Sequence, residues 1–162
     1  MARNGESRSG RASDEVTAVD KRIIEQLQKD GRRSYTSIAS DLGISEAAVR
    51  ARVGRLTRKG VLQIVGVTDP LKLGFREMAM VAVRCDGERL VEIADEIAAF
   101  PETSYLVITA GTYDLLVETV CEDNEALLRF LTERIRRVPG VRDTETFVYL
   151  RMVKQTYQWG TR

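Results

Sequence analysis

The stretch SEAAVRARVGRLTRKG, residues 45–60, decides how the N-terminal part of the chain folds. Val49, Val53 and Leu56 recur at helical spacing, which predicts a helix from Ser45 to about Lys59 with these residues in the core. The opposite side carries alanine, glycine and arginine, and no acid follows its first turn. A face of small residues rimmed by positive charge suits a polyanion with a groove.

The alternative is a solvated helix whose arginines pair with acids elsewhere, and the charge run alone favours it. The preceding sequence shifts the balance toward a binding face. Thr17 begins a capping pattern for a first helix that ends at Gly31, and Ser34 can cap a second, short helix that ends at Gly43. Three helices with a tight glycine turn before the third are typical of a helix-turn-helix. The inward residues expected on the first two helices are Val19, Ile23, Ile24, Leu27, Ile38, Ala39 and Leu42.

Beyond this region the hydrophobic periods alternate between strand and helix. A strand is expected at 61–68 (VLQIVGVT), followed by four strands at 77–84, 104–109, 115–120 and 144–153, with helices at 87–100 and 123–138. The order β-α-β-β-α-β is the ferredoxin-like arrangement, so the fold class is α+β. The helix stripes expected are Leu90, Val91, Ala94 and Ile97, then Leu127, Leu128, Leu131 and Ile135.

Helices on one face of such a sheet leave the other face in need of cover. Met78, Met80, Val107 and Tyr149 can lie on that open face. The sequence therefore predicts that a partner sheet covers it.

Composition suggests two units with different partners and points away from catalysis. Residues 1–62 hold 13 Lys/Arg against 8 Asp/Glu, whereas residues 63–162 hold 12 against 16, so the formal net charge of +1 divides into +5 and −4. There is no histidine, and no paired-carboxylate or phosphate-loop pattern, so we expect no enzyme, metal site or cofactor.

Cys85 and Cys121 form no C-x-x-C spacing and are expected to be free thiols. Residues 1–16 are expected to form a disordered basic arm without the apolar core of a signal peptide, and no apolar run is long enough for a membrane span, which predicts a cytoplasmic protein.

An ordered set of motifs carries a resemblance over residues 18–155. The chain resembles the Lrp/AsnC (feast/famine) transcriptional regulators of bacteria and archaea. The matching pieces are D-x-x-I-I-x-x-L-Q-x-D-G-R at 20–32, I-A-x-D-L-G-I-S-x-x-A-V-x-x-R-V-x-R-L at 38–56, K-G-V-L at 59–62, L-G-F at 73–75, A-G-T-Y-D at 110–114 and V-P-G-V-R-D-T-E-T at 138–146.

The resemblance implies a domain plan and an assembly. The expected plan is an arm (1–16), a helix-turn-helix domain (17–60), a strand-bearing linker (61–75), a ligand-sensing RAM domain with the β-α-β-β-α-β order (76–156) and a tail (157–162). It implies homodimers that assemble further into tetramers or octamers. It also implies a small-molecule effector, often an amino acid, that binds between dimers and alters assembly or affinity for double-stranded DNA.

Site residues follow from the resemblance by position. Those expected to read bases are Ser45, Glu46, Ala47, Arg50 and Ala51; those expected to hold phosphates are Arg55, Arg58 and Lys59, with Ser34 and Tyr35 as further backbone contacts. The effector-binding residues expected are Gly111, Thr112, Tyr113, Asp114, Thr144 and Thr146. Gly111 would bring backbone amides near a carboxylate, and Asp114 could accept from an ammonium group. The alternative for 111–114 is a plain hairpin in which Gly111 serves only its dihedral angles.

Two function hypotheses remain beside an enzyme, which has little support. The first is a DNA-binding transcriptional regulator whose affinity or assembly responds to a metabolite. The second is an architectural DNA-coating protein without an effector response. Both use the same helix-turn-helix region, so a response to an amino acid separates them.

Overall fold

The computed structural model describes residues 15–157 and 159–161. The chain divides into two compact units: the part up to Gly66 together with the segment after Lys154, and Val67–Lys154. The division falls inside the expected linker. Most of the expected N-terminal arm, residues 1–14, lies outside the described residues.

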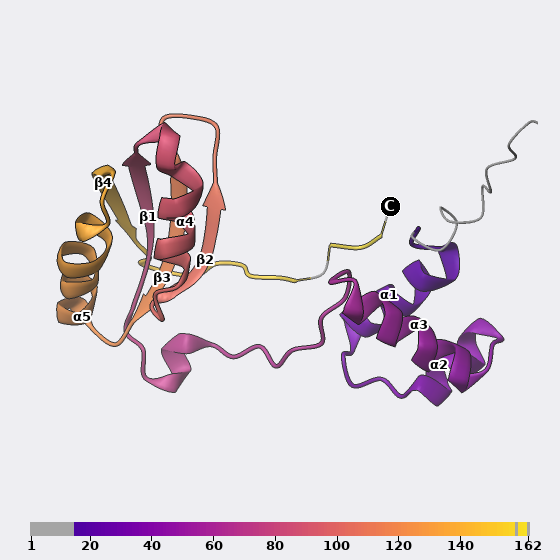
Figure 1. Ribbon diagram of the computed structural model, residues 1–162. Coiled ribbons are helices and arrows are strands. Elements are labelled where there is room, and N and C mark those ends of the chain that lie inside the picture. The colour runs from indigo at the N-terminus through magenta and orange to yellow at the C-terminus, as the bar shows by residue number, and fades with distance from the viewer. Residues whose placement is uncertain (1–14, 158, 162) are drawn as a thin grey trace, which may run out of the picture. The chain divides into compact units, whose positions relative to one another are not determined.

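Three helices form the first unit (Figure 1): α1 (Ala18–Lys29), α2 (Tyr35–Leu42) and α3 (Glu46–Arg58). Each begins at a side chain that accepts from the backbone of its first turn. The Ser34 and Ser45 hydroxyls each accept a backbone N–H three residues later, at 3.1 Å. Gly43 has a φ of 67°, so the sharp turn between α2 and α3 needs a residue that tolerates the left-handed region.

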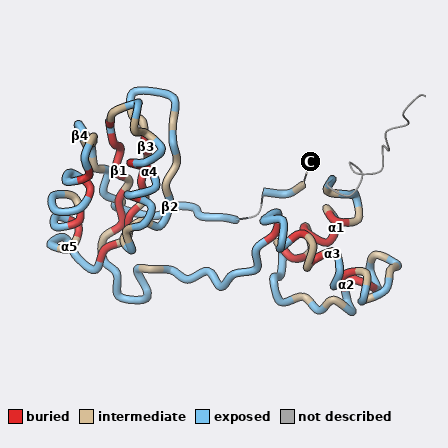
Figure 2. Tube along the Cα trace, in the orientation of Figure 1, coloured by how far each residue is buried: buried red, intermediate tan, exposed pale blue. Residues whose placement is uncertain are grey.

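The core of this unit is the one that the helical spacing predicts. Val49 and Leu56 are fully buried and Val53 nearly so, which confirms the stripe on α3. Figure 2 shows the buried segments of the three helices facing one another. The other members of this core are Ile23, Ile24, Leu27, Ile38, Ala39 and Leu62, with Val19 and Leu42 packed at its margin.

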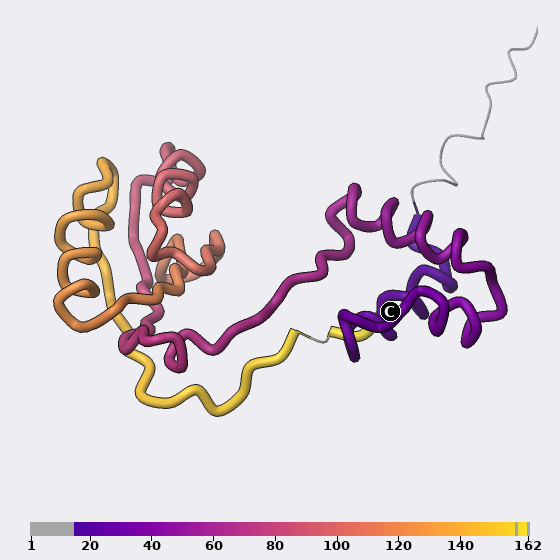
Figure 3. Tube along the Cα trace, turned by 90° about the horizontal axis from the view of Figure 1, so that it is seen from below, coloured from indigo at the N-terminus to yellow at the C-terminus, as the bar shows by residue number. Residues whose placement is uncertain are grey.

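The prediction of a strand at 61–68 is wrong. Leu62 returns to the helical core, but the residues that follow run as an extended, exposed chain (Figure 3). A strand needs a neighbour for its N–H and C=O groups, and none of the described segments pairs with this one. A short 3-10 turn, Pro70–Leu73, follows and ends at Gly74 with a φ of 100°.

The second unit is a four-stranded antiparallel sheet with helices on one face, which confirms the expected α+β fold (Figure 1). The strand order is β2-β3-β1-β4. The strands are β1 (Glu77–Cys85), β2 (Thr103–Ile108), β3 (Leu115–Cys121) and β4 (Val141–Val148). Helix α4 (Leu90–Ala98) follows a 3-10 turn at Gly87–Arg89. Helix α5 (Asn124–Arg129) continues as a π-helical turn to Arg134 and then a 3-10 turn to Arg137.

Two helix stripes differ from expectation. Val91 and Leu128 are 63% and 53% exposed, whereas Ile93 and Phe130 are buried in their place. On a wheel at about 100° per residue, Ile93 falls about 40° from Ile97 and Val91 about 120° from it, so the assignment of Val91 to the stripe of α4 is wrong. In α5, the π-helical turn that begins at Phe130 departs from this spacing.

The last strand was expected at 144–153 but spans Val141–Val148. Its bounds follow its partner, because Val141 lies opposite Cys85 and Val148 lies opposite Ala79. One further bond, from the Tyr149 N–H to the Met78 carbonyl at 2.8 Å, closes the ladder. Pairing therefore ends where β1 begins.

Register divides the sheet into two faces. Ala79, Val81 and Val83 pack against the helices, so the alternate residues of β1 point to the open face. The pairing places Met78, Met80, Val107 and Tyr149 there, as expected, together with Phe147, which is 49% exposed. Tyr149 donates to Glu118 at 3.0 Å. Burial, and then this bond to Glu118, raises the pKa of Tyr149 to about 12.

Candidate nucleic-acid interface and effector region

The outward side of α3 is smooth at its centre and charged at its flanks. Ala47 and Ala51 are exposed, and Gly54 follows them one turn further on. Arg58 and Lys59 are exposed at the C-terminal end of the helix. A helix with small side chains along one side can approach another surface closely, and the major groove admits a helix.

A polar cluster joins the start of α3 to the start of α2. The Glu46 carboxylate accepts from the Thr36 hydroxyl at 2.7 Å and from Arg50 at 2.6 Å. The Arg50 guanidinium also lies over the Tyr35 ring, 5.3 Å from its centroid. The bond from Thr36, and then that from Arg50, lowers the pKa of Glu46. The structure thus brings together three of the residues expected at DNA.

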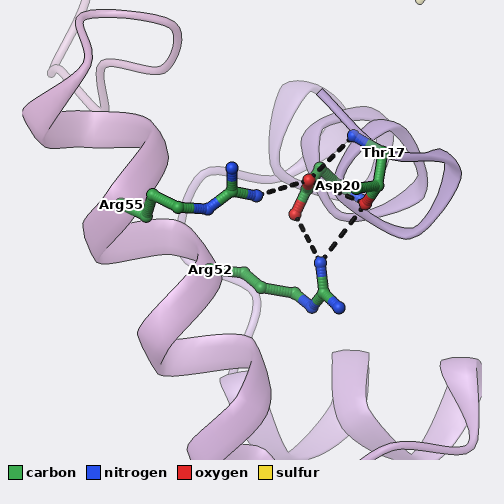
Figure 4. Close-up of polar contacts among 4 residues, drawn as sticks. All are labelled: Thr17, Asp20, Arg52 and Arg55. Carbon is green, nitrogen blue, oxygen red and sulfur yellow. Dashed lines mark hydrogen bonds and ion pairs between the residues drawn. The ribbon is translucent and has the colours of Figure 1, made fainter. Parts of the chain in front are cut away.

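The other flank of α3 is tied to α1 through a buried carboxylate (Figure 4). Asp20 is fully buried, and it accepts from Arg52 at 3.0 Å and from Arg55 at 2.5 Å. It also closes the capping box of α1, because the Thr17 N–H and hydroxyl donate to it at 2.9 and 2.7 Å. Burial raises the pKa of Asp20, but these hydrogen bonds outweigh burial and hold the pKa well below its ordinary range.

This network was missed in the sequence. Arg55 was expected to hold phosphate, and the structure gives its guanidinium an internal partner, with 27% of the side chain exposed. Arg52 was not singled out at all. Local sequence carries no signal for this network, because 32 and 35 residues separate Asp20 from Arg52 and Arg55.

The segment 109–114 is the hairpin between β2 and β3, and its polar atoms bind the sheet. The Asp114 carboxylate accepts from the Cys85 N–H at 2.8 Å, at the bulge of β1. The Thr109 N–H donates to the Asp114 carbonyl at 2.8 Å. Asp114 therefore has a structural role that was not expected. Gly111 does not have a positive φ, and a Cβ there would meet no atom within 4 Å, so the dihedral reason given for this glycine is wrong.

The six expected effector residues do not gather on one face of the sheet. Tyr113 donates to Glu145, whose partner Ala82 points to the open face, and Arg84 lies over the Tyr113 ring at 4.9 Å. Thr144 lies opposite the core residue Val83 and therefore faces the helices. There it accepts from the Nε of Arg136 at 3.0 Å. Thr146, opposite Val81, shares that side, while Gly111 and Thr112 are exposed in the hairpin.

Both cysteines of the chain lie in the sheet unit. Cys85 and Cys121 are free and buried, which confirms the expectation. Burial is the main cause that raises the pKa of both thiols. Over residues 15–157 and 159–161, no three His, Cys, Asp or Glu side chains gather as metal ligands. No helix in that part of the chain is long and apolar enough to cross a membrane.

Two family models match the two units. The AsnC-type helix-turn-helix domain matches residues 16–57, which include α1, α2 and nearly all of α3. The Lrp/AsnC ligand binding domain matches residues 78–159, which include the whole sheet after its first residue.

Known proteins are similar over most of the chain. An uncharacterised HTH-type transcriptional regulator of Pyrococcus horikoshii, PH0140, is 33% identical over 144 residues, which are 88% of this chain and 91% of that protein. The solved structure of E. coli AsnC has a TM-score of 0.76 at 20% identity, over 87% of this chain and 96% of that one. A feast or famine regulatory protein from M. tuberculosis, complexed with L-methionine, has a TM-score of 0.81 at 24% identity, over 91% and 100%. At these identities the two structures bear on the fold.

Proposed function

This chain belongs to the Lrp/AsnC family of transcriptional regulators, and from that premise we propose that it binds specific sequences of double-stranded DNA through α2 and α3. We propose further that a small effector, an amino acid or a related metabolite, changes its DNA affinity or its assembly. The family is one of regulators rather than of enzymes.

The proposal of DNA binding rests on the small exposed residues and the positive charge of the outward side of α3. Ala47 and Ala51 are exposed, with Arg50 and Arg58 at the margins, so the helix can enter a major groove with positive charge toward the phosphates. Ser45, Glu46, Ala47, Arg50 and Ala51 are the proposed base contacts. Ser34, Tyr35, Arg58 and Lys59 are the proposed backbone contacts, with Arg55 a weaker one because Asp20 holds its guanidinium.

The effector site is proposed at the hairpin and at β4. Gly111 supports it, because a glycine without a positive φ and with open space at its Cβ position suits close approach of a ligand. Tyr113 and Thr144 lie on opposite faces of one sheet, so we propose that two copies complete each site. The M. tuberculosis relative was solved with L-methionine, which supports an amino acid as the class of effector.

Assembly is proposed to begin at the open face of the sheet. Phe147 is 49% exposed there beside Met80, with Val107 on the same face across the sheet, and a second sheet would remove this apolar surface from water. The proposed unit is a homodimer that assembles to a tetramer or octamer and works in the cytoplasm. The alternative function, an architectural DNA-coating protein, shares the α3 face but needs no effector.

Fluorescence anisotropy tests the proposal. The full-length protein is titrated onto a duplex from its own upstream region and onto a scrambled duplex, at near-physiological salt, without and with a pool of amino acids. Tighter binding to the native duplex and a shift with the pool are expected. Equal binding to both duplexes without any shift would favour the architectural alternative.

A further inference from the structure

The N-terminal half of the outward side of α3 has no side chain at its centre that can form a hydrogen bond. Ala47 and Ala51 occupy it, whereas further along the helix the Arg58 guanidinium lies 3.4 Å from the position of a Cβ on Gly54. An alanine methyl can contact a thymine methyl, but it cannot distinguish the donors and acceptors on base edges. Hydrogen-bonding readout of sequence by this half of the helix must therefore come from its flanks.

The two flanks are not equivalent. On the side of α1, the Arg55 side chain is 27% exposed and its guanidinium is bound to buried Asp20. On the side of α2, the side chains of Arg50 and Glu46 are 66% and 43% exposed. The accessible polar groups therefore lie on the flank toward α2, near the N-terminus of α3.

Glu46 and Arg50 present an acceptor and a donor side by side. The two groups are 2.6 Å apart, and neither is used up by that bond, because a carboxylate has four acceptor positions and a guanidinium has five N–H donors. Thr36 holds the carboxylate from α2 at 2.7 Å, and the Tyr35 ring supports the guanidinium. Two neighbouring residues of α2 therefore orient both groups before any ligand binds.

The base edges differ in how well they complement this pair. In the major groove, guanine offers two acceptors, O6 and N7, and its cytosine partner offers the N4 amino donor. In an adenine–thymine pair the acceptors N7 and thymine O4 are separated by the adenine N6 amino donor, so arginine finds no two adjacent acceptors. A fixed arginine beside a fixed carboxylate thus gains three hydrogen bonds with a C·G pair and fewer with A·T.

We propose that Glu46 and Arg50 act as one reading unit that selects a C·G base pair in each half-site, with Arg50 donating to guanine O6 and N7 and Glu46 accepting from cytosine N4. This inference rests on the proposed DNA binding and specifies its sequence preference. Ala47 and Ala51 contact the adjoining steps without hydrogen bonds, and Thr36 and Tyr35 act as positioning residues.

The test measures base preference rather than affinity alone. The full-length protein selects duplexes from a random-sequence pool, and each base pair of the selected half-site is then replaced in turn. Dissociation constants are measured for the wild type, Glu46→Gln and Arg50→Ala, with Arg58→Ala as the matched control. Arg58 lies two turns further on and is proposed to contact phosphate. Helical circular dichroism verifies that every variant is folded.

The wild type is expected to favour C·G over T·A about tenfold at one position. Arg50→Ala should reduce that preference to below about twofold, and Glu46→Gln should lower it without a comparable loss of overall affinity. Arg58→Ala should weaken binding to all duplexes alike and keep the preference. An unchanged preference in both Glu46→Gln and Arg50→Ala would overturn the reading unit alone. A wild type that selects no sequence would instead overturn the proposed function.

Discussion

Asp20 in the first turn of α1 lies 2.5 Å from Arg55 of α3, although 35 residues separate them in the sequence. The same carboxylate also binds Arg52, so α1 holds α3 at two points. The orientation of the exposed side of α3 therefore depends on one buried charge.

Replacing Asp20 should destabilise the helical unit. Asp20→Asn removes the charge that pairs with Arg52 and Arg55 and should lower the free energy of unfolding by about 3 kcal/mol, measured by urea denaturation. Asp41→Asn is the control, because its pair with Arg33 is solvent-exposed and should contribute less than about 1 kcal/mol. Equal losses in the two variants would show that the buried network is not a special source of stability.

Acid should reveal the same carboxylate. The folded pKa of Asp20 lies below its ordinary value of about 3.9, so its stabilisation is complete above that pH and is lost as the pH falls through the folded pKa. Between pH 7 and about pH 2, wild-type stability should approach that of Asp20→Asn, measured as the difference between urea midpoints. A difference that stays constant over this range would contradict the lowered pKa.

Salt should separate the arginines that contact phosphate from the arginine that holds α1. Arg58→Gln should reduce the slope of log affinity against log salt by about 0.9, because one phosphate contact is lost. Arg55 is bound to Asp20, so Arg55→Gln should lower stability and change the slope less. The measurement is DNA affinity at four or so salt concentrations. A larger slope change for Arg55→Gln would place Arg55 on phosphate and Arg58 away from it.

Two glycines should respond differently to alanine. Gly140 has a φ of 99°, and a Cβ there would lie 2.8 Å from Ile93 Cδ1, so Gly140→Ala should destabilise the sheet unit by about 1–3 kcal/mol. Gly111→Ala meets neither obstacle and should leave thermal unfolding unchanged while weakening the effector response. A stable Gly111→Ala with a full response would remove Gly111 from the effector site.

Sequence periodicity predicted the elements well wherever burial followed a regular helix or a paired strand. Val49, Val53 and Leu56 are buried as expected because α3 is an unbroken α-helix with caps at both ends. The expected stripes placed Val91 and Leu128 wrongly. Regular helical spacing puts Ile93, and not Val91, on the face of Ile97, and α5 passes into a π-helical turn at Phe130. The strand at 61–68 has the composition of a strand but lacks a neighbour, and a neighbour is a tertiary property.

The sequence proposes a set of site residues but not the contacts among them. The contact between Glu46 and Arg50 follows from their spacing, because residues four apart on a helix are neighbours. The bonds of Asp20 with Arg55 and of Asp114 with the bulge at Cys85 join distant parts of the chain. The face of β4 on which Thr144 lies follows from the register of β4 with β1, and no local sequence pattern gives that register.

The central claim is that the exposed side of α3 enters DNA, and one affinity comparison tests it most directly. Ala51→Glu places a negative charge on that side, whereas Ala99→Glu makes the same change at an exposed position after α4. On the selected duplex, Ala51→Glu should weaken binding by about 100-fold or more, and Ala99→Glu should bind like the wild type. Equal affinities for Ala51→Glu and Ala99→Glu would show that DNA does not approach α3 and would contradict the account.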